Sequence, residues 1–180
     1  MTLYHGSNTE IDRGLTSPID LGKCRPYKDF GKGFYTSPSE DQARAMARRT
    51  ARIYGGNPSI TLFEVDDSIL SSGAFKVRVF DGPTIEWAHF VMNNRNRAFT
   101  DISSVECNID NKYDIVSGPV ANDDLVALLN LFIAGTISNA ALTAEMTYRK
   151  MTSQISFHTD KVIVHLFKTG VIEDRGRSYG

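Results

Sequence analysis

The chain is poor in cysteine, the residue that small secreted proteins use to stabilise a core. It has two cysteines in 180 residues, Cys24 and Cys107, and they lie far apart with neither CxxC nor Cys/His ligand spacing. Metal sites and disulfide frameworks show themselves in sequence by such spacing. We interpret both residues as free thiols in a reducing compartment, and we expect no metal site.

Long apolar runs and an excess of charge of one sign are also absent. The longest apolar run, LVALLNLFIAG at 125–135, is too short to cross a bilayer. The N-terminus MTLYHGSN lacks the basic and apolar parts of a signal peptide. The formal net charge of -1 gives no overall footprint for nucleic acid or a membrane, although a local basic patch stays open. We therefore expect a cytoplasmic protein with no membrane partner.

The rest of the composition is that of one ordinary domain. Hydrophobic residues make up 41% of the chain and charged residues 23%, values typical of soluble globular proteins. A chain of 180 residues is long enough to bury a core. Because it shows no repeat, low-complexity segment or linker, we expect a single domain over residues 1–180, with 172–180 as a flexible tail.

Strand and helix patterns are mixed along the chain. Ser37, followed by Pro38 and Glu40, is the predicted N-cap of the first long helix. Residues 6–8 are expected as a turn, and 9–27 as a short helix or turn followed by a loop. The predicted strands span 1–5, 30–36, 60–65, 75–79, 113–120 and 153–158, and the predicted helices 38–54, 83–95, 125–135, 138–151 and 160–167. The last of these helices could instead be a strand, because the segment VIVHLF is compatible with either structure. The mixture of strands and helices predicts an α+β fold class.

Three polar or aromatic residues of the predicted strands stand out, the first of them at a strand end. They are His5 in the first strand, Tyr35 in the second and Gln154 in a late one. Taken singly, a histidine at a strand end is most often a satisfied turn residue, a strand tyrosine is usually core, and a strand glutamine is usually solvated. Their spacing alone does not join them into a site.

A family resemblance joins them. The segment YHGS at 4–7, followed by FGKGFYTS at 30–37 and a helix, resembles the ADP-ribosyltransferase fold of the diphtheria-toxin and poly(ADP-ribose) polymerase type. The order HGS, KDFGKGFYT, GPVANDD and QxxFHT is similar to that of an uncharacterised bacterial family of this type, from Leu3 to about Lys161. The resemblance implies a split β-sandwich of two small sheets with flanking helices.

The resemblance also implies a site for NAD+ as co-substrate, without a metal, in a cleft between the two sheets. His5 would donate a hydrogen bond to a ribose hydroxyl, and the backbone of Gly6 would pair with the nicotinamide carboxamide. Ser7 would either contact the ligand or cap the turn. Tyr35 would stack its ring on the nicotinamide, and glycines such as Gly33 would let the ligand approach the strand.

Two departures from the family pattern bear on the chemistry. Gln154 stands where related transferases have a glutamate, and an amide can position the ribose but cannot act as a general base. Either the acceptor needs no such base, or another carboxylate substitutes, with Glu145 and Asp160 nearest in sequence, or the site is inactive. The helix positions that carry a serine and a second tyrosine in polymerases fall at Ala43 and Met46.

Because of the second departure, the face of the nicotinamide opposite Tyr35 would be covered by a more flexible side chain, which we call the second wall. That wall would be Met46, or Trp87 or Phe90 from the next helix, and mono-transfer is favoured over polymer synthesis. The NAD+ pyrophosphate needs a cation, and Arg25 and Lys28 either supply it or are solvated loop charges.

The sequence therefore predicts an NAD+-dependent mono-ADP-ribosyltransferase acting on a macromolecular acceptor, either protein or nucleic acid. Its role as a toxin or phage-defence effector held by an antitoxin protein rests on analogy. The alternatives are a catalytically inert NAD+- or ADP-ribose-binding module and an NAD+ hydrolase on the same fold. An RNA phosphotransferase is disfavoured, because a stacking tyrosine suits nicotinamide.

Overall fold

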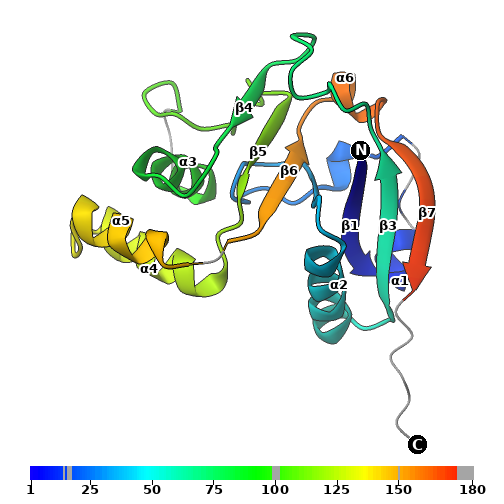
Figure 1. Ribbon diagram of the computed structural model, residues 1–180, viewed down its shortest axis with the longest axis horizontal. Helices are drawn as coiled ribbons and strands as arrows, with labels where there is room; N and C mark the ends of the chain where they lie inside the picture. The colour runs from blue at the N-terminus through cyan, green and yellow to red at the C-terminus, as the bar shows by residue number, and fades with distance from the viewer. Residues whose placement is uncertain (14, 16–17, 99–101, 150, 174–180) are drawn as a thin grey trace, which may run out of the picture.

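Two small β-sheets with flanking helices make up the α+β fold of this chain (Figure 1). A computed structural model describes residues 1–13, 15, 18–98, 102–149 and 151–173. The first sheet is antiparallel with strand order β1-β3-β7, comprising β1 (Thr2–Asn8), β3 (Pro58–Glu64) and β7 (Phe167–Glu173). The second has the order β2-β6-β5-β4, comprising β2 (Phe34–Thr36), β6 (Ser153–Phe157), β5 (Ile115–Pro119) and β4 (Val77–Val79). In it only β4 and β5 pair in parallel among the described strands.

The helices divide between the two sheets. The helical elements are α1 (Thr9–Arg13), the 3₁₀ turn η1 (Leu21–Lys23), α2 (Glu40–Tyr54), α3 (Ile85–Arg95), α4 (Asp123–Ile133), α5 (Asn139–Thr147) and α6 (Asp160–Ile163). Helix α2 packs on the first sheet, and α3, α4 and α5 gather beside the second (Figure 1). Among the described residues, no helix combines the length and apolar character that a bilayer crossing needs.

Side chains of both sheets meet in a shared core. Leu3 of β1 and Phe63 of β3 belong to the same buried cluster as Phe34, Ile115 and Phe157 of the second sheet. The other face of the second sheet packs against α3, α4 and α5 in a larger cluster. Because strand residues alternate between faces, neighbours such as Phe34 and Tyr35 point into different clusters.

The edge strands of the two sheets are joined directly. Tyr4 of β1 and Ser37, just after β2, exchange two backbone hydrogen bonds of 2.8 Å each. This bridge brings the HGS motif next to the GFYT motif, although 30 residues separate them in sequence.

Several predicted elements are confirmed and others shift. The strand at 153–158 and the helix ending at 54 agree closely with β6 and α2. The turn predicted at 6–8 is wrong, because β1 continues to Asn8 in register with β3. The strand predicted at 30–36 shortens to β2, because Gly31 adopts a φ of 91° and its N–H bonds back to the Lys28 carbonyl in a turn.

The remaining differences lie at element ends. Ser39, not Ser37, caps α2, because the backbone of Ser37 is held in the bridge to β1. The helix predicted at 138–151 ends at Thr147, and the one predicted at 160–167 ends at Ile163. Strand β7 follows to Glu173, so the predicted tail is strand at 172–173, and the rest of that tail lies outside the described residues.

Candidate functional site

His5 lies at the junction of the two sheets. Its Nδ1 is 2.7 Å from the carbonyl oxygen of Tyr35, and its ring stacks on Phe34 with 4.5 Å between ring centroids. A carbonyl oxygen only accepts hydrogen bonds, so Nδ1 must carry the proton. Burial lowers the pKa of His5 below its usual value, which favours the neutral ring.

This tautomer leaves a lone pair on Nε2 of His5. No hydrogen bond from a described residue occupies that atom. The ring can therefore accept a hydrogen bond from a ligand hydroxyl, whereas the family resemblance implied that it would donate one. The described geometry makes His5 an acceptor site at the edge of both sheets.

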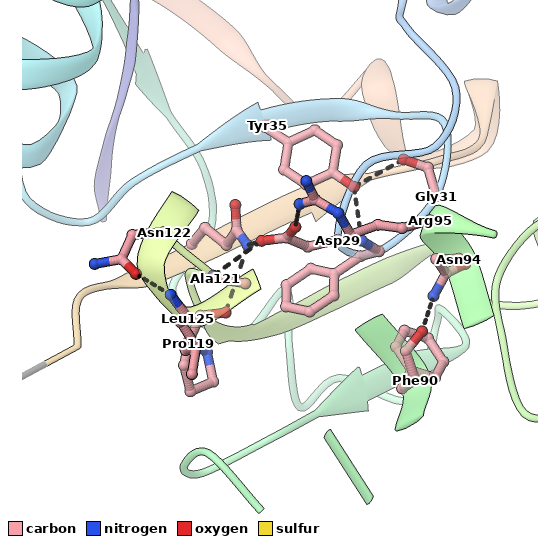
Figure 2. Close-up of polar contacts among 12 residues, drawn as sticks. Asp29, Gly31, Tyr35, Phe90, Asn94, Arg95, Pro119, Ala121, Asn122 and Leu125 are labelled. Carbon is pink, nitrogen blue, oxygen red and sulfur yellow. Dashed lines mark hydrogen bonds and ion pairs between the residues drawn. The ribbon is translucent and has the colours of Figure 1, made fainter. Parts of the chain in front are cut away.

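Tyr35 anchors the glycine-rich turn that precedes β2. Its hydroxyl donates to the Gly31 carbonyl at 2.7 Å and accepts from the Phe30 N–H at 3.0 Å (Figure 2). Burial raises the pKa of this phenol well above 10, so the hydroxyl stays protonated. The ring lies edge-on to His158 at 6.2 Å between centroids. The hydroxyl is thus fully engaged, while the half-buried ring keeps the orientation that the turn imposes.

The glycines of both motifs make room for protein groups. A Cβ on Gly6 would lie 1.9 Å from the Ala43 carbonyl oxygen of α2, and one on Gly33 would lie 2.5 Å from Nδ1 of His158. The predicted reason for these glycines, close approach of a ligand, is therefore not needed to explain them. Ser7 is buried inside β1 opposite Ser59, so the idea that it caps a turn is wrong.

Gln154 and Asp29 form a buried polar pair on β6 and the turn before β2. The amide nitrogen of Gln154 donates to Oδ2 of Asp29 at 3.0 Å and faces the Pro119 carbonyl at 3.5 Å. The Asp29 carboxylate also accepts from Arg95 at 2.6 Å and from the Ala121 N–H at 3.0 Å (Figure 2). Only 8% of Gln154 and 7% of Asp29 is exposed, so this network is almost closed to water.

Asp29 is the carboxylate that sequence reasoning missed. Of the two candidates named from proximity in sequence, Glu145 pairs with Arg149 at 3.7 Å on the exposed side of α5, and Asp160 is exposed at the start of α6. Neither is hydrogen-bonded to Gln154 in the described structure. The available signal was the position of Asp29 inside the KDFGKGFYT motif, between a lysine and a glycine turn.

A second buried pair, Ser156 and His158, lies next to Tyr35. Nδ1 of His158 is 2.8 Å from the Lys32 carbonyl, and Nε2 is 2.8 Å from the Ser156 hydroxyl. Burial lowers the pKa of His158 to about 4, so the ring is neutral, with its proton on Nδ1. With 2% of His158 exposed, the pair supports the turn and cannot serve as a solvent-accessible nucleophile and base.

Basic side chains gather at the C-terminal end of α2. Arg25 donates to the Tyr54 hydroxyl at 2.8 Å and lies 5.0 Å from the centre of its ring. Arg25 is the main cause of a lowered pKa of Tyr54, with smaller effects from Lys28 and Arg49. We call Arg25, Lys28, Arg49 and Tyr54 the basic cluster. The two residues predicted to contact phosphate thus lie near a third cation, Arg49, which is itself ion-paired with Asp123 at 2.8 Å.

The second wall expected for a nicotinamide is only partly available. Met46 lies on α2 with 45% of its surface exposed, so a ligand can reach it. Trp87 and Phe90 are 0% exposed in the core between α3 and the second sheet, which excludes both as wall residues. Across the described residues, no group of three His, Cys, Asp or Glu side chains is placed to hold a metal ion, and both cysteines are free.

The site residues are only partly brought together. Tyr35 pairs with Ser156 across β2 and β6, so Gln154, two residues away, shares its face of the sheet. The His5 ring stacks instead on Phe34, which points to the other face. The structure therefore joins His5 to the backbone of Tyr35 and leaves Gln154 beyond it on the helix-covered side.

Comparison with known proteins assigns a family. The family described as "Protein of unknown function (DUF3990)" matches residues 1–167, and the chain belongs to it. No curated protein and no solved structure matches the chain. The matched residues include every predicted site residue, from His5 to Gln154.

Proposed function

We propose that this member of a family of unknown function is an NAD+-dependent mono-ADP-ribosyltransferase, built as an ADP-ribosyltransferase-like split β-sandwich. The supporting observation is the sheet junction. Three hydrogen bonds, two between Tyr4 and Ser37 and one between His5 and Tyr35, hold the HGS and GFYT motifs together. Two motifs whose sequences resemble those of ADP-ribosyltransferases thus lie side by side in the structure, at the edges of two different sheets.

The proposed reaction breaks the glycosidic bond between nicotinamide and ribose. Nicotinamide leaves with the bonding electron pair, and the ribose C1′ passes through an oxocarbenium-like state. An acceptor nucleophile then bonds to C1′ and releases its proton to solvent. Nε2 of His5 accepts a hydrogen bond from a ribose hydroxyl, and the Tyr35 ring offers a flat face to nicotinamide. Gln154 positions the ribose without acting as the base, since an amide does not take up a proton at neutral pH.

The basic cluster suits the diphosphate of the same ligand. Arg25 and Lys28 extend from the loop before β2, and charge-assisted hydrogen bonds from such groups bind phosphate oxygens well. Because His5 faces one side of β2 and Gln154 the other, an extended dinucleotide that crosses the junction is the kind of ligand that reaches both. We take the acceptor to be a macromolecule, protein or nucleic acid, in the cytoplasm, and an antitoxin protein to be the partner that restrains the enzyme.

One rival has its own support. The neutral Gln154 amide is almost buried and is bonded to Asp29, as would suit a module that binds NAD+ or ADP-ribose and leaves it intact. A hydrolase differs from the transferase only in using water as the acceptor.

Nicotinamide release separates the transferase from the inert module. The purified chain is incubated with NAD+, and bound NAD+ and free nicotinamide are both measured. The transferase proposal expects both binding and release, with release lost in His5→Ala and unchanged in Arg52→Ala, an exposed residue in the last turn of α2. Binding without release, in the presence of cell lysate as a source of acceptors, would support the inert module instead.

A further inference from the structure

We propose that Asp29 is a positioning residue that fixes the Gln154 amide with its oxygen toward the ligand, so that this site requires glutamine and is impaired by glutamate. The orientation of the amide stands on contacts within the protein. The identity of the ligand group rests on the transferase proposed above.

The amide orientation follows from what surrounds it. The two groups that face one end of the Gln154 side chain are a carboxylate oxygen of Asp29, at 3.0 Å, and the carbonyl oxygen of Pro119, at 3.5 Å. Both only accept hydrogen bonds, so the NH₂ end of the amide must point at them. Oε1 then points away, and no described residue donates to it. That oxygen is left to accept a hydrogen bond from a ribose hydroxyl.

Asp29 is held as rigidly as a positioning role demands. Arg95 from α3 and the backbone N–H of Ala121 bind its two oxygens, at 2.6 and 3.0 Å (Figure 2). The turn that carries it closes through a 3.0 Å bond from Gly31 N–H to the Lys28 carbonyl. Tyr35 locks the same turn through its hydroxyl. The aromatic residue of the GFYT motif therefore also sets the place of Asp29, and through it of Gln154.

This geometry reverses the simplest expectation for the site. The family resemblance implies a glutamate at this position, so the simplest expectation is that Gln154→Glu raises the activity. Here the new carboxylate would meet the Asp29 carboxylate across the present 3.0 Å contact, inside a network with one cation, Arg95. Like charges this close and this buried repel strongly. Gln154→Glu should therefore lower both stability and nicotinamide release.

Removing the Asp29 carboxylate should recover part of the stability and nicotinamide release that Gln154→Glu loses. In the double variant Asp29→Asn with Gln154→Glu, the asparagine NH₂ faces the new carboxylate, and one carboxylate remains near Arg95. The Ala121 N–H, which donates to the same Oδ2 as Gln154, loses its acceptor in this variant. The double variant should therefore perform better than the sum of the two single losses predicts. Such non-additivity is the signature of two residues in direct contact.

The experiment is a double-mutant cycle with two readouts, the melting temperature and nicotinamide release, each release assay run well below the Tm of that variant. Gln154→Glu is expected to lower Tm by more than about 4 °C and release by about tenfold or more. The double variant should regain part of both losses, but not all, because the Ala121 N–H no longer has its acceptor. Gln42→Glu, the same change at the chain's other glutamine, in the first turn of α2, is the control and should not lower Tm.

Wild-type Tm and wild-type or higher release in Gln154→Glu, or strictly additive losses in the double variant, would overturn the proposal. If the wild type itself releases no nicotinamide, the transferase proposal fails, and the Tm cycle alone still decides whether Asp29 holds the amide. Unfolding by itself cannot mimic the expected result, because recovery requires a second substitution at a contacting residue.

Discussion

The imidazole of His5 and the carbonyl of Tyr35 lie 2.7 Å apart, and this hydrogen bond ties the edge strand of one sheet to the edge strand of the other. The same ring carries the lone pair that the proposed chemistry uses. Binding and sheet assembly therefore depend on one side chain, and substitutions must separate the two roles.

His5→Asn should make that separation. The asparagine NH₂ can take the place of Nδ1 and donate to the Tyr35 carbonyl, while the acceptor at Nε2 is lost. We expect the free energy of unfolding to fall by less than about 1 kcal/mol, while nicotinamide release falls by about tenfold or more. His5→Ala should lose both properties. Urea unfolding and a release assay measure the two effects, and full release by His5→Asn would remove His5 from the chemistry.

His158 should make stability depend on pH. Its pKa is about 4 in the folded protein and 6.5 as the ordinary value, so between these limits the unfolded chain binds more protons. Stability is therefore complete above pH 6.5 and declines as the pH falls toward 4, by about 3 kcal/mol at about 1.36 kcal/mol per pKa unit.

The variant His158→Asn isolates this effect. Its amide keeps a donor toward the Lys32 carbonyl but does not titrate in this range. Urea unfolding at a series of pH values should show a shallower decline for the variant, even though its stability at pH 7 is lower. Equal slopes for the two proteins would contradict the assignment.

Gly6 should resist even the smallest substitution. A Cβ there would lie 1.9 Å from the Ala43 carbonyl oxygen, so Gly6→Ala must push α2 away from β1. We expect a loss of about 1–3 kcal/mol in the free energy of unfolding. Gly82→Ala, at a site with no atom within 4 Å of the added carbon, is the matched control and should stay within about 0.5 kcal/mol of the wild type.

Arg25 should act on the phosphate part of the ligand only. Loss of its charge in Arg25→Ala is expected to weaken ADP-ribose binding by about tenfold, and the effect should shrink as salt rises. Binding of nicotinamide alone should not change. Titration calorimetry with both ligands measures this, with Arg52→Ala as control. An equal loss of ADP-ribose affinity in Arg25→Ala and Arg52→Ala would mean that the basic cluster acts only through general surface charge.

Local signals in the sequence predicted much of the fold. Caps and glycine stops depend on neighbouring residues only, and α2 and α4 begin and end near the expected 38–54 and 125–135. The cap of α2 is nevertheless Ser39 and not the predicted Ser37. The predictions were wrong where pairing between segments distant in sequence determines the secondary structure. Residues 6–8 carry turn chemistry, yet they pair with β3 in a continuous strand. A segment rich in turn residues becomes a strand when a partner strand supplies its hydrogen bonds.

The residues of the candidate site were predicted from the sequence, but the contacts that hold them were not. His5, Tyr35 and Gln154 could be named because they stand in recognisable motifs. The bond from Gln154 to Asp29 joins residues 125 positions apart, and the burial of Asp29 depends on Arg95 and Ala121, which no local pattern links to it. Buried carboxylates are rare without such partners, so sequence alone gave no reason to place Asp29 inside.

The most direct test of the proposed function uses NAD+ labelled in its adenylate phosphate, incubated with the purified protein and a cell lysate. Free nicotinamide is measured, and label is followed separately into protein and nucleic acid. We expect nicotinamide release with label in one of the two macromolecular fractions, abolished in His5→Ala. Nicotinamide release with label only in free ADP-ribose, or no release while NAD+ remains bound, would contradict the transferase.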